Sequence, residues 1–336
     1  MMKRMQQWLL AMACVAGSFQ PSQAQEPDWT AVRLPWKAEN HWDAVVLGGV
    51  ARVTDINNAG QVVGWSSSGV DPQSFLYDPQ YGRLRSIGLG GTQSQATAIN
   101  NAGQVVGWGN LQGGATRHAF IYDPLVGTAR QIPDPYGVET QAVGINERGH
   151  VISRAPILPH LGYTSYGTVY DGSTVAALRG APLAINNSGL VFGQYISGTS
   201  RPPSLWLHPS DEEVLSVGIG GGWGTFGVDL NDSGQVVGFR GAGHAFIHAG
   251  SQTVDLGTLG GSYSTPKDLN NAGQVVGEAS LGDDNSNHAF LWDDGVMTDL
   301  GTLGGRNSVA TAVNELGQVV GFSEVAPGSS ERHAFF

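Results

Sequence analysis

The chain has 336 residues, of which 40% are hydrophobic and 13% charged, and its net charge is −11. An acidic protein repels phosphate backbones, so this balance argues against nucleic acid and anionic membranes as partners. The hydrophobic content is sufficient for a packed core, and the 50 glycines recur at fixed positions, which indicates turns rather than disorder.

The first 24 residues have the pattern of an export signal. Lys3 and Arg4 precede an apolar stretch from Trp8 to Phe19, and Ser22-Gln23-Ala24 offers small residues at the two positions that a signal peptidase reads. The apolar stretch is too short to span a bilayer of roughly 30 Å, so it predicts no membrane anchor. We therefore expect cleavage after Ala24 and a protein that resides in the periplasm or outside the cell.

The lone cysteine, Cys14, lies inside this signal. Cys14 is either an ordinary apolar residue of the signal or a lipidated residue at the mature N-terminus. The preceding Ala11-Met12-Ala13 lacks the leucine that usually precedes a lipidated cysteine. Cleavage after Ala24 removes the cysteine and with it any disulfide framework. It also leaves 15 basic against 28 acidic residues. We expect residues 25–42 to form a lead segment and residues 43–336 to form one monomeric domain.

One motif recurs seven times along that domain, at intervals of 39 to 46 residues: an aliphatic residue, Asn, two variable residues, Gly and an aliphatic run. Between two apolar runs, Asn-x-x-Gly predicts a hairpin turn, because Asn can bond the backbone two residues on and Gly adopts the left-handed conformation. We expect these asparagines to be structural. They are Asn57, Asn100, Asn146, Asn186, Asn231, Asn270 and Asn314.

Two further signatures follow the motif, the first after every copy and the second after three of them. The first, His-Ala-Phe, begins at His118, His244, His288 and His333, and looser versions begin at Gln73, Tyr166 and Pro203. The second resembles Asp-Leu-Gly-Thr-Leu-Gly-Gly and ends at Gly91, Gly261 and Gly305. One repeat is thus a strand A, a turn, a strand B, a loop, a strand C, a turn and a strand D. In the second copy, strands A, B and C are expected at Gln95–Asn100, Gln104–Trp108 and His118–Asp123.

Strands such as Val-Val-Gly-Trp are apolar on both faces, which is typical of sheets covered on both sides. A repeat of this length cannot cover both faces alone, so neighbouring sheets must stack. We predict an all-β fold, a seven-bladed β-propeller of four-stranded antiparallel blades. The seventh copy reaches Phe336 without a strand D, whereas Asp43–Gly49 reads as a spare one. We therefore predict that residues 43–47 complete the last blade and leave no long exposed edge.

These signatures resemble the HAF-repeat family, the bacterial probable extracellular repeat proteins. The resemblance covers residues 43–336, and copies three and four depart from it most, with His150 in place of Gln and Ser153 in place of Gly. It implies an exported repeat protein and brings no established activity.

Metal binding has two candidates in the sequence. The four His-Ala-Phe histidines occupy equivalent positions in different blades, so we expect them to lie far apart and to serve a structural role, such as a backbone hydrogen bond. His244 and His248 would share a strand face but lack a third ligand. Asp283, Asn285 and Asn287 begin like a calcium loop, but His288 stands where that loop requires Gly. We expect neither a metal nor another cofactor.

The sequence contains no nucleophile elbow, zincin helix or phosphate loop. Variable B–C loops on a rigid scaffold favour ligand binding, and we expect a glycan or protein ligand on the face that they share with the D–A connections. One alternative is an extracellular hydrolase or lyase with Asp55, Asp229 and Asp268 in the central channel; another is a purely structural surface protein. The candidate ligand-binding residues are Trp223, Tyr136, Tyr163, Tyr195, Tyr263, Arg117, Arg201, Arg240 and Arg306.

Overall fold

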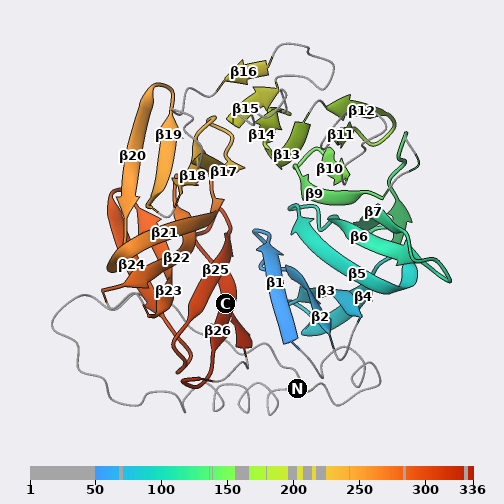
Figure 1. The fold of residues 1–336 in the computed structure, drawn as a ribbon. Coiled ribbons are helices and arrows are strands. Elements are labelled where there is room, and N and C mark those ends of the chain that lie inside the picture. The colour runs from blue at the N-terminus through green and yellow to red at the C-terminus, as the bar shows by residue number, and fades with distance from the viewer. Residues whose placement is uncertain are drawn as a thin grey trace. The chain divides into compact units, whose positions relative to one another are not determined.

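The structure is a computed structural model, and it describes residues 50–67, 71–135, 137, 139–155, 166–178, 180–195, 203–206, 214–216, 225–241, 243–282, 285–328 and 332–336. In these ranges the chain forms seven antiparallel sheets of consecutive strands around a centre (Figure 1). Six sheets have four strands and the seventh has three. The prediction of a seven-bladed β-propeller is thus confirmed. No helix in the described ranges is long and apolar enough to cross a membrane.

The four strands of each blade follow the predicted order. The A strands are β1 (Val50–Ile56), β5 (Gly90–Ile99), β9 (Gln141–Ile145), β13 (Gly180–Ile185), β17 (Thr225–Leu230), β21 (Gly260–Leu269) and β25 (Ser308–Val313). The B strands are β2 (Val62–Ser67), β6 (Val105–Leu111), β10 (Val151–Ala155), β14 (Val191–Tyr195), β18 (Val236–Arg240), β22 (Val275–Leu281) and β26 (Val319–Glu324).

The outer strands complete the blades. The C strands are β3 (Pro72–Asp78), β7 (Arg117–Asp123), β11 (Tyr166–Tyr170), β15 (Pro203–Trp206), β19 (Ala245–Ala249), β23 (Asn287–Asp293) and β27 (Arg332–Phe335). The D strands are β4 (Arg83–Ile87), β8 (Thr128–Gln131), β12 (Val175–Leu178), β16 (Val214–Ser216), β20 (Gln252–Gly257) and β24 (Val296–Gly301). In the second blade, strand A begins five residues before the predicted start because its glycine-rich lead-in already pairs with β6.

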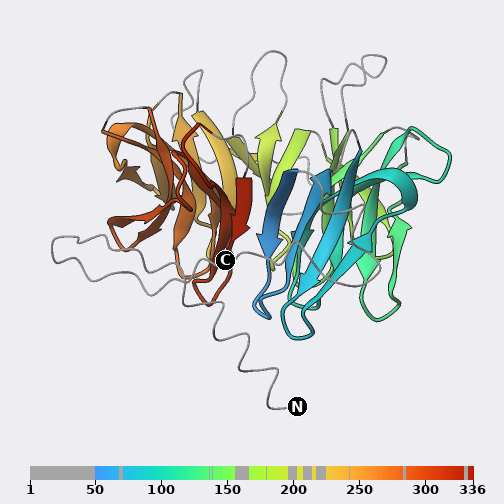
Figure 2. The same cartoon turned by 90° about the horizontal axis from the view of Figure 1, so that it is seen from below.

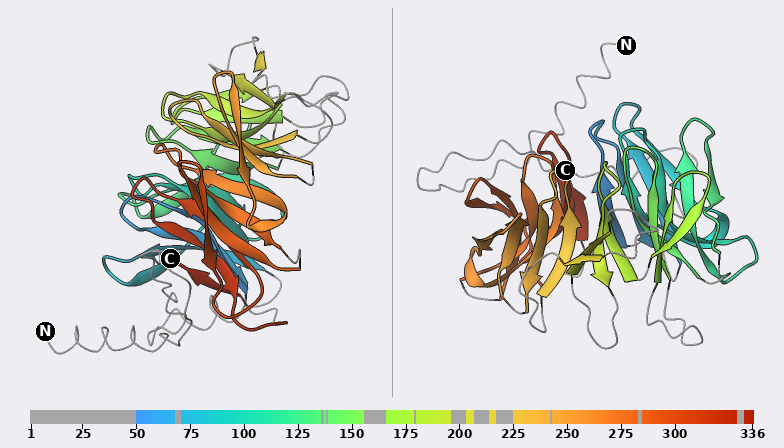
Figure 3. Two further views of the ribbon diagram at one scale, coloured as in Figure 1. Left: turned by 90° about the vertical axis from the view of Figure 1, so that its left-hand side faces the viewer. Right: turned by 90° about the horizontal axis from the view of Figure 1, so that it is seen from above.

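Successive A strands contact one another, and β25 returns to contact β1. The A–B and C–D turns lie at one edge of the sheets, which we call the turn face, and the B–C loops and D–A connections lie at the other, the loop face (Figure 2; Figure 3). The two faces differ in how regular they are, because the turns are set by the repeated motif whereas the loops vary in length from blade to blade.

The repeated Asn-x-x-Gly segment folds as a turn closed by a bulge. In the second blade, Gly103 N donates to Asn100 O (2.9 Å) and Asn100 N donates to Gln104 O (3.1 Å). Gly103 has a φ of +76°, a left-handed conformation that favours glycine. The Asn100 side chain reinforces the turn, since its Oδ1 accepts from Gln104 N at 3.0 Å.

A second glycine of the repeat allows strands A and B to approach closely. A Cβ atom on Gly107 in β6 would overlap the carbonyl oxygen of Gln95 in β5, and Gly64, Gly238, Gly277 and Gly321 are equally confined. Strand A has an irregular register beside this position, between Ala96 and Ala98 in the second blade. The glycine of Val-Val-Gly is therefore required by packing rather than by turn geometry.

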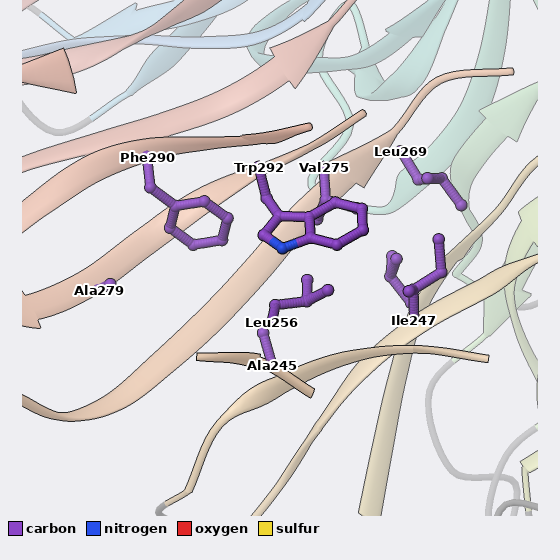
Figure 4. Close-up of a cluster of buried hydrophobic side chains, with 9 residues drawn as sticks. Ala245, Ile247, Leu256, Leu269, Val275, Ala279, Phe290 and Trp292 are labelled. Carbon is purple, nitrogen blue, oxygen red and sulfur yellow. The ribbon is translucent and has the colours of Figure 1, made fainter. Parts of the chain in front are cut away.

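Each pair of neighbouring blades shares a hydrophobic cluster. Between blades 5 and 6, for example, Ile247 and Leu256 pack with Val275, Phe290 and Trp292 (Figure 4). Equivalent clusters lie at the other six junctions. The cluster between blades 7 and 1 is one of these six, and in it Val53 and Phe75 pack with Val320 and Ala334. The core is thus a set of seven inter-blade layers, which explains why both faces of most strands are apolar.

The predicted closing strand, residues 43–47, lies outside the described residues, as do the predicted export signal and lead segment. The described part of the seventh blade is β25-β26-β27.

A ring of asparagines closes the described structure independently of that strand. The Nδ2 of each motif asparagine donates to the backbone oxygen of the motif asparagine in the next blade, at 3.0 to 3.2 Å, and Asn314 donates to Asn57. All seven asparagines are buried, with 2 to 5% of their surface exposed. The ring therefore connects seven blades through seven hydrogen bonds that are shielded from water.

Candidate functional site

Two cavities have a composition that bears on function, one at each face. The first, the turn cavity, has a volume of about 180 Å³ and is lined by the A–B turns of all seven blades. Its lining includes five carboxylates and, among the described residues, neither Lys nor Arg. The five are Asp55, Glu147, Asp232, Asp268 and Glu315.

Three aspartates join adjacent blades at this end of the channel. Asp55, Asp229 and Asp268 each stand two residues before the motif asparagine, and each accepts a backbone N–H from strand A of the next blade. The bonds run from Ile99 N to Asp55 Oδ2 (2.8 Å), from Leu269 N to Asp229 Oδ2 (3.0 Å) and from Val313 N to Asp268 Oδ2 (2.7 Å). The other four blades have Ala or Gly at this position. These carboxylates therefore reinforce only the junctions 1/2, 5/6 and 6/7.

The enclosure of these groups changes their acidity. Asp55 is partly exposed to the turn cavity, but protein surrounds it, and this desolvation, together with the charge of Asp268, raises the pKa of Asp55 to about 8. Desolvation also raises the pKa of Asp229 well above its usual value, as do the charge of Asp268 and the hydrogen bond between the two carboxyl groups. Burial and the neighbouring Asp268 thus favour the protonated form of Asp229.

The rim of the turn cavity is a second ring of hydrogen bonds. The residue after each motif asparagine accepts, through its side chain, the backbone N–H of its counterpart in the preceding blade, at 2.7 to 3.3 Å. The seven residues are Asn58, Asn101, Glu147, Asn187, Asp232, Asn271 and Glu315. Desolvation raises the pKa of Glu315 on this rim. The acidic side chains here are therefore acceptors that the ring requires.

The second cavity, the loop cavity, lies toward the loop face of blades 6, 7 and 1 and has a volume of about 480 Å³. Three cations from three blades line it: Arg52 of β1, Lys267 of β21 and Arg332 of β27. The guanidinium carbons of Arg52 and Arg332 lie 5.7 and 5.3 Å from the centre of the Phe322 ring. Arg52 also lies over Trp65, at 5.5 Å. Aromatic rings thus hold two of the three cations in place.

Two of these cations have carboxylate partners. Lys267 Nζ lies 3.0 Å from Glu278 Oε1, and Arg332 Nη2 lies 4.0 Å from Glu324 Oε1. Hydrogen bonds from the Asn307 side chain and the Arg306 backbone lower the pKa of Glu324, with a further contribution from the charge of Arg332. Among the described residues, Arg52 makes no ion pair. Counted over the described residues, the loop cavity therefore carries about one uncompensated positive charge.

The candidate ligand-binding residues from the sequence do not converge in the described structure. Trp223, Tyr136, Tyr163 and Arg201 lie outside the described residues, as does the side chain of Tyr195 at the end of β14. The other four lie on separate blades, and none lines the loop cavity. Arg117 lies 4.5 Å over Trp108, Arg240 lies 5.6 Å over Phe246, the Tyr263 N–H donates to Ser280, and the Arg306 N–H donates to Glu324.

Sequence reasoning missed Arg52, Lys267, Arg332 and Phe322. One signal was available, because Lys267 occupies a position where Thr54, Thr97 and Thr311 stand in blades 1, 2 and 7. These threonines donate to backbone oxygens. A charged residue at such a position indicates a local function beyond the repeat.

Three of the four His-Ala-Phe histidines pair within their own blades. His244 Nδ1 lies 2.9 Å from Asp255, and His288 Nδ1 lies 2.9 Å from Asp299, so strand C is joined to strand D. In blade 2, His118 contacts Gln131 at 3.1 Å instead. The partner is a side chain rather than the expected backbone group. His248 contacts Thr253, at 2.8 Å.

In the described part of the chain, no group of three or more His, Cys, Asp or Glu residues is arranged to hold a metal ion. Of the calcium-loop candidates, Asp283 lies outside the described residues. Asn287 begins β23, where its N–H donates to Asn307 Oδ1 (3.0 Å), and Asn285 lies just before that strand.

Comparisons with known proteins establish the fold alone. No family model and no curated protein matches the chain. The β-propeller domain of the Trilobed protease from Pyrococcus furiosus, described as having an open velcro topology, is 12% identical, with a TM-score of 0.56 over 75% of this chain and 84% of that one. An acylaminoacyl peptidase from Pyrococcus horikoshii is 11% identical, with a TM-score of 0.57 over 85% of this chain and 51% of that one.

A chain of the Mitotic Checkpoint Complex is also similar, at 11% identity and a TM-score of 0.51 over 96% of this chain and 98% of that one. The chain spans about half the length of the Pyrococcus horikoshii peptidase. Since fold similarity at such identities does not carry activity, the function must be argued from the two cavities.

Proposed function

We propose that this protein is a binding module that acts outside the cytoplasm and holds an anionic ligand in the loop cavity. The observation that carries the proposal is Arg52, a cation without a carboxylate partner among the described residues, in a cavity whose volume is in the range of ligand sites. The pattern of an export signal in residues 1–24 supports a location in the periplasm or outside the cell.

The surroundings of Arg52 support the same conclusion. In an acidic protein, a cavity with three cations attracts an anion locally, although the net charge repels large polyanions. A guanidinium group presents paired N–H donors that match a carboxylate or sulfate, and Trp65 and Phe322 restrict where it can lie. The site is therefore preorganised, which reduces the entropy lost on binding.

A hydrolase or lyase in the channel is the second candidate. The observation that favours it is Asp229 beside Asp268, because burial and the neighbouring carboxylate raise the pKa of Asp229, as happens in acid–base sites. Each of them already accepts a backbone N–H from the neighbouring blade. This structural role accounts for their presence, and for that reason we prefer the binding module.

Thermal-shift and calorimetric titrations of the mature protein test the proposal. The probes are acetate, sulfate, phosphate, a neutral oligosaccharide and an oligosaccharide of uronic acids. We expect at least one anionic probe to raise the melting temperature of the wild type and of Arg83→Gln, a variant of the outer strand β4 with the same charge change. Arg52→Gln should abolish that response. Equal responses of Arg52→Gln and Arg83→Gln, or no response to any anion, would contradict the proposal.

A further inference from the structure

The loop cavity has features that favour one kind of anion over others, and the inference drawn from these features rests on the proposed binding function. From them we infer that the ligand is a sugar acid, a pyranose unit that carries a single carboxylate, as in a uronic-acid polysaccharide. Three observations support the inference: the number of cations without a carboxylate partner, the polar groups that line the cavity, and the apolar part of the cavity wall.

The charge count favours one carboxylate. Lys267 is neutralised by Glu278 at 3.0 Å, and Arg332 has Glu324 at 4.0 Å, so of the three cations only the Arg52 guanidinium has no carboxylate partner among the described residues. Inorganic phosphate and free sulfate carry more negative charge per ion than one guanidinium compensates, because each further charge would leave water without a partner. A single carboxylate matches the paired donors of one guanidinium.

The polar groups of the cavity match hydroxyls rather than a second charge. The side-chain amide of Asn287 lines the cavity and makes no hydrogen bond within the described part of the chain. Glu278 contacts Lys267 through Oε1, which leaves Oε2 as an acceptor, and the Lys267 ammonium has further N–H donors. The cavity thus offers both donors and acceptors, as vicinal hydroxyls require, since each hydroxyl both donates and accepts.

Part of the cavity wall is apolar. Val309 and the ring of Phe322 line it, and both residues belong to blade 7, across from Lys267 and Glu278 of blade 6. The C–H face of a pyranose can pack on such a wall while its hydroxyls reach the polar side. A fatty acid would leave Asn287 and Glu278 facing apolar carbon, which is costly for polar groups withdrawn from water.

Isothermal titration of the mature protein with four probes tests this inference. The probes are trigalacturonate, the neutral trisaccharide made by reducing its carboxyl groups, hexanoate and inorganic phosphate. We expect trigalacturonate to bind more than about tenfold more tightly than the other three, the difference that one charge-assisted pair provides. Arg52→Gln should lose that advantage, Asn287→Ala should weaken trigalacturonate several-fold, and Arg83→Gln should bind as the wild type does.

The outcomes separate the inference from the proposed function. If hexanoate or phosphate binds as tightly as trigalacturonate and depends on Arg52, the sugar-acid inference is wrong while the anion-binding function stands. Equal binding of the neutral trisaccharide would show that the carboxylate is not recognised. No binding of any probe overturns both. Melting temperatures confirm that each variant folds. If Arg52→Gln does not fold, Arg52→Lys replaces it in the titration, because lysine keeps the charge but lacks the paired donors.

Discussion

The turn face and the loop face are built from different kinds of residue. At the turn face, the motif asparagine and the residue after it repeat in all seven blades, and both form closed rings of hydrogen bonds. At the loop face, Arg52 and Lys267 each occur in one blade and have no counterparts of the same kind, whereas Arg332 has Arg117 as its counterpart in blade 2. Positions that repeat therefore build the ring, and positions that break the repeat are where a ligand can be recognised.

The three channel aspartates fall between these classes. They sit among repeated positions but occur in only three blades, and each joins its blade to the next. Their irregular distribution resembles that of a functional site, whereas their contacts are those of a structural one. Geometry, rather than sequence position, separates the two roles here.

The largest effect should come from breaking the ring at its least regular junction. Removal of residues 25–49 would remove the segment that we expect to complete the seventh blade, whose described part has three strands. We expect the melting temperature of the whole domain to fall by ten degrees or more, because an exposed strand edge and an incomplete inter-blade layer weaken a closed structure. Differential scanning calorimetry measures this.

The matched control removes residues 25–42 only. It keeps Asp43, which stands four residues before Leu-Gly-Gly as Asp255 and Asp299 do in blades 5 and 6. We expect this shorter deletion to melt like the mature protein. If the two deletions melt alike, the closure prediction is wrong.

The next largest effect should come from the first of the two hydrogen-bond rings at the turn face, the one formed by the motif asparagines. The Asn57 carboxamide makes four hydrogen bonds, to Ala59 N, Gln61 N, Gln61 Oε1 and Asn100 O, and is 3% exposed. Asn57→Ala leaves several buried groups unpaired, so we expect a loss of about 3 kcal/mol or more in the free energy of unfolding. Asn58→Ala removes a half-exposed acceptor and should cost about 1 kcal/mol or less. Urea denaturation measures both, and equal losses would refute the distinction between the rings.

Much of this fold could be predicted from the sequence because the repeat is itself a physical signal. Asn-x-x-Gly encodes the turn, strands apolar on both faces encode stacking, and the seven copies encode the number of blades. What the motif could not show is that the asparagine side chain reaches the next blade, since a bond such as Asn57 to Asn100 spans one whole repeat.

The site was less predictable for a related reason. Arg52, Lys267 and Arg332 come from blades 1, 6 and 7, which are adjacent only because the ring closes. Aromatic and Arg residues near loops, such as Arg117 and Arg240, looked like ligand groups, but neither of these two arginines lines the loop cavity. Because Arg52, Lys267 and Arg332 lie far apart in the sequence, their proximity in space could not be predicted, whereas Arg117 and Arg240 were proposed because they lie near loops.

A smaller effect should appear as a pH dependence from the turn cavity. The pKa of Asp55 is about 8 in the folded protein and near 3.8 in an unfolded chain. Between these values the folded state holds a proton that the unfolded state has released, so the free energy of unfolding falls as the pH rises from about 4 to 8 and levels off above it. The slope that Asp55 contributes is at most about 1.4 kcal/mol per pH unit.

Asp55→Asn cannot titrate, so its stability should depend less steeply on pH than that of the wild type, as followed by urea denaturation at several pH values. Asp171→Asn is the matched control, because hydrogen bonds from Thr174 and Ser173 lower the pKa of Asp171 and keep it ionised across this range. Its curve should run parallel to that of the wild type. If the free energy of unfolding instead rose between pH 4 and 8, and more steeply in the wild type than in Asp55→Asn, the predicted direction of the pH dependence would be wrong.

The smallest effect concerns the histidine–aspartate pairs of the outer strands. The side chains of His288 and Asp299 are 19% and 39% exposed, and those of His244 and Asp255 are 41% and 67% exposed. Since solvent screens such pairs, we expect Asp299→Asn and Asp255→Asn each to lower the free energy of unfolding by less than about 1 kcal/mol, with the larger loss at Asp299. Because each pair joins two strands of one blade, neither variant should change ligand binding in the loop cavity. A loss of binding in either variant would place these histidines in the functional site and would break the division between repeated and irregular positions.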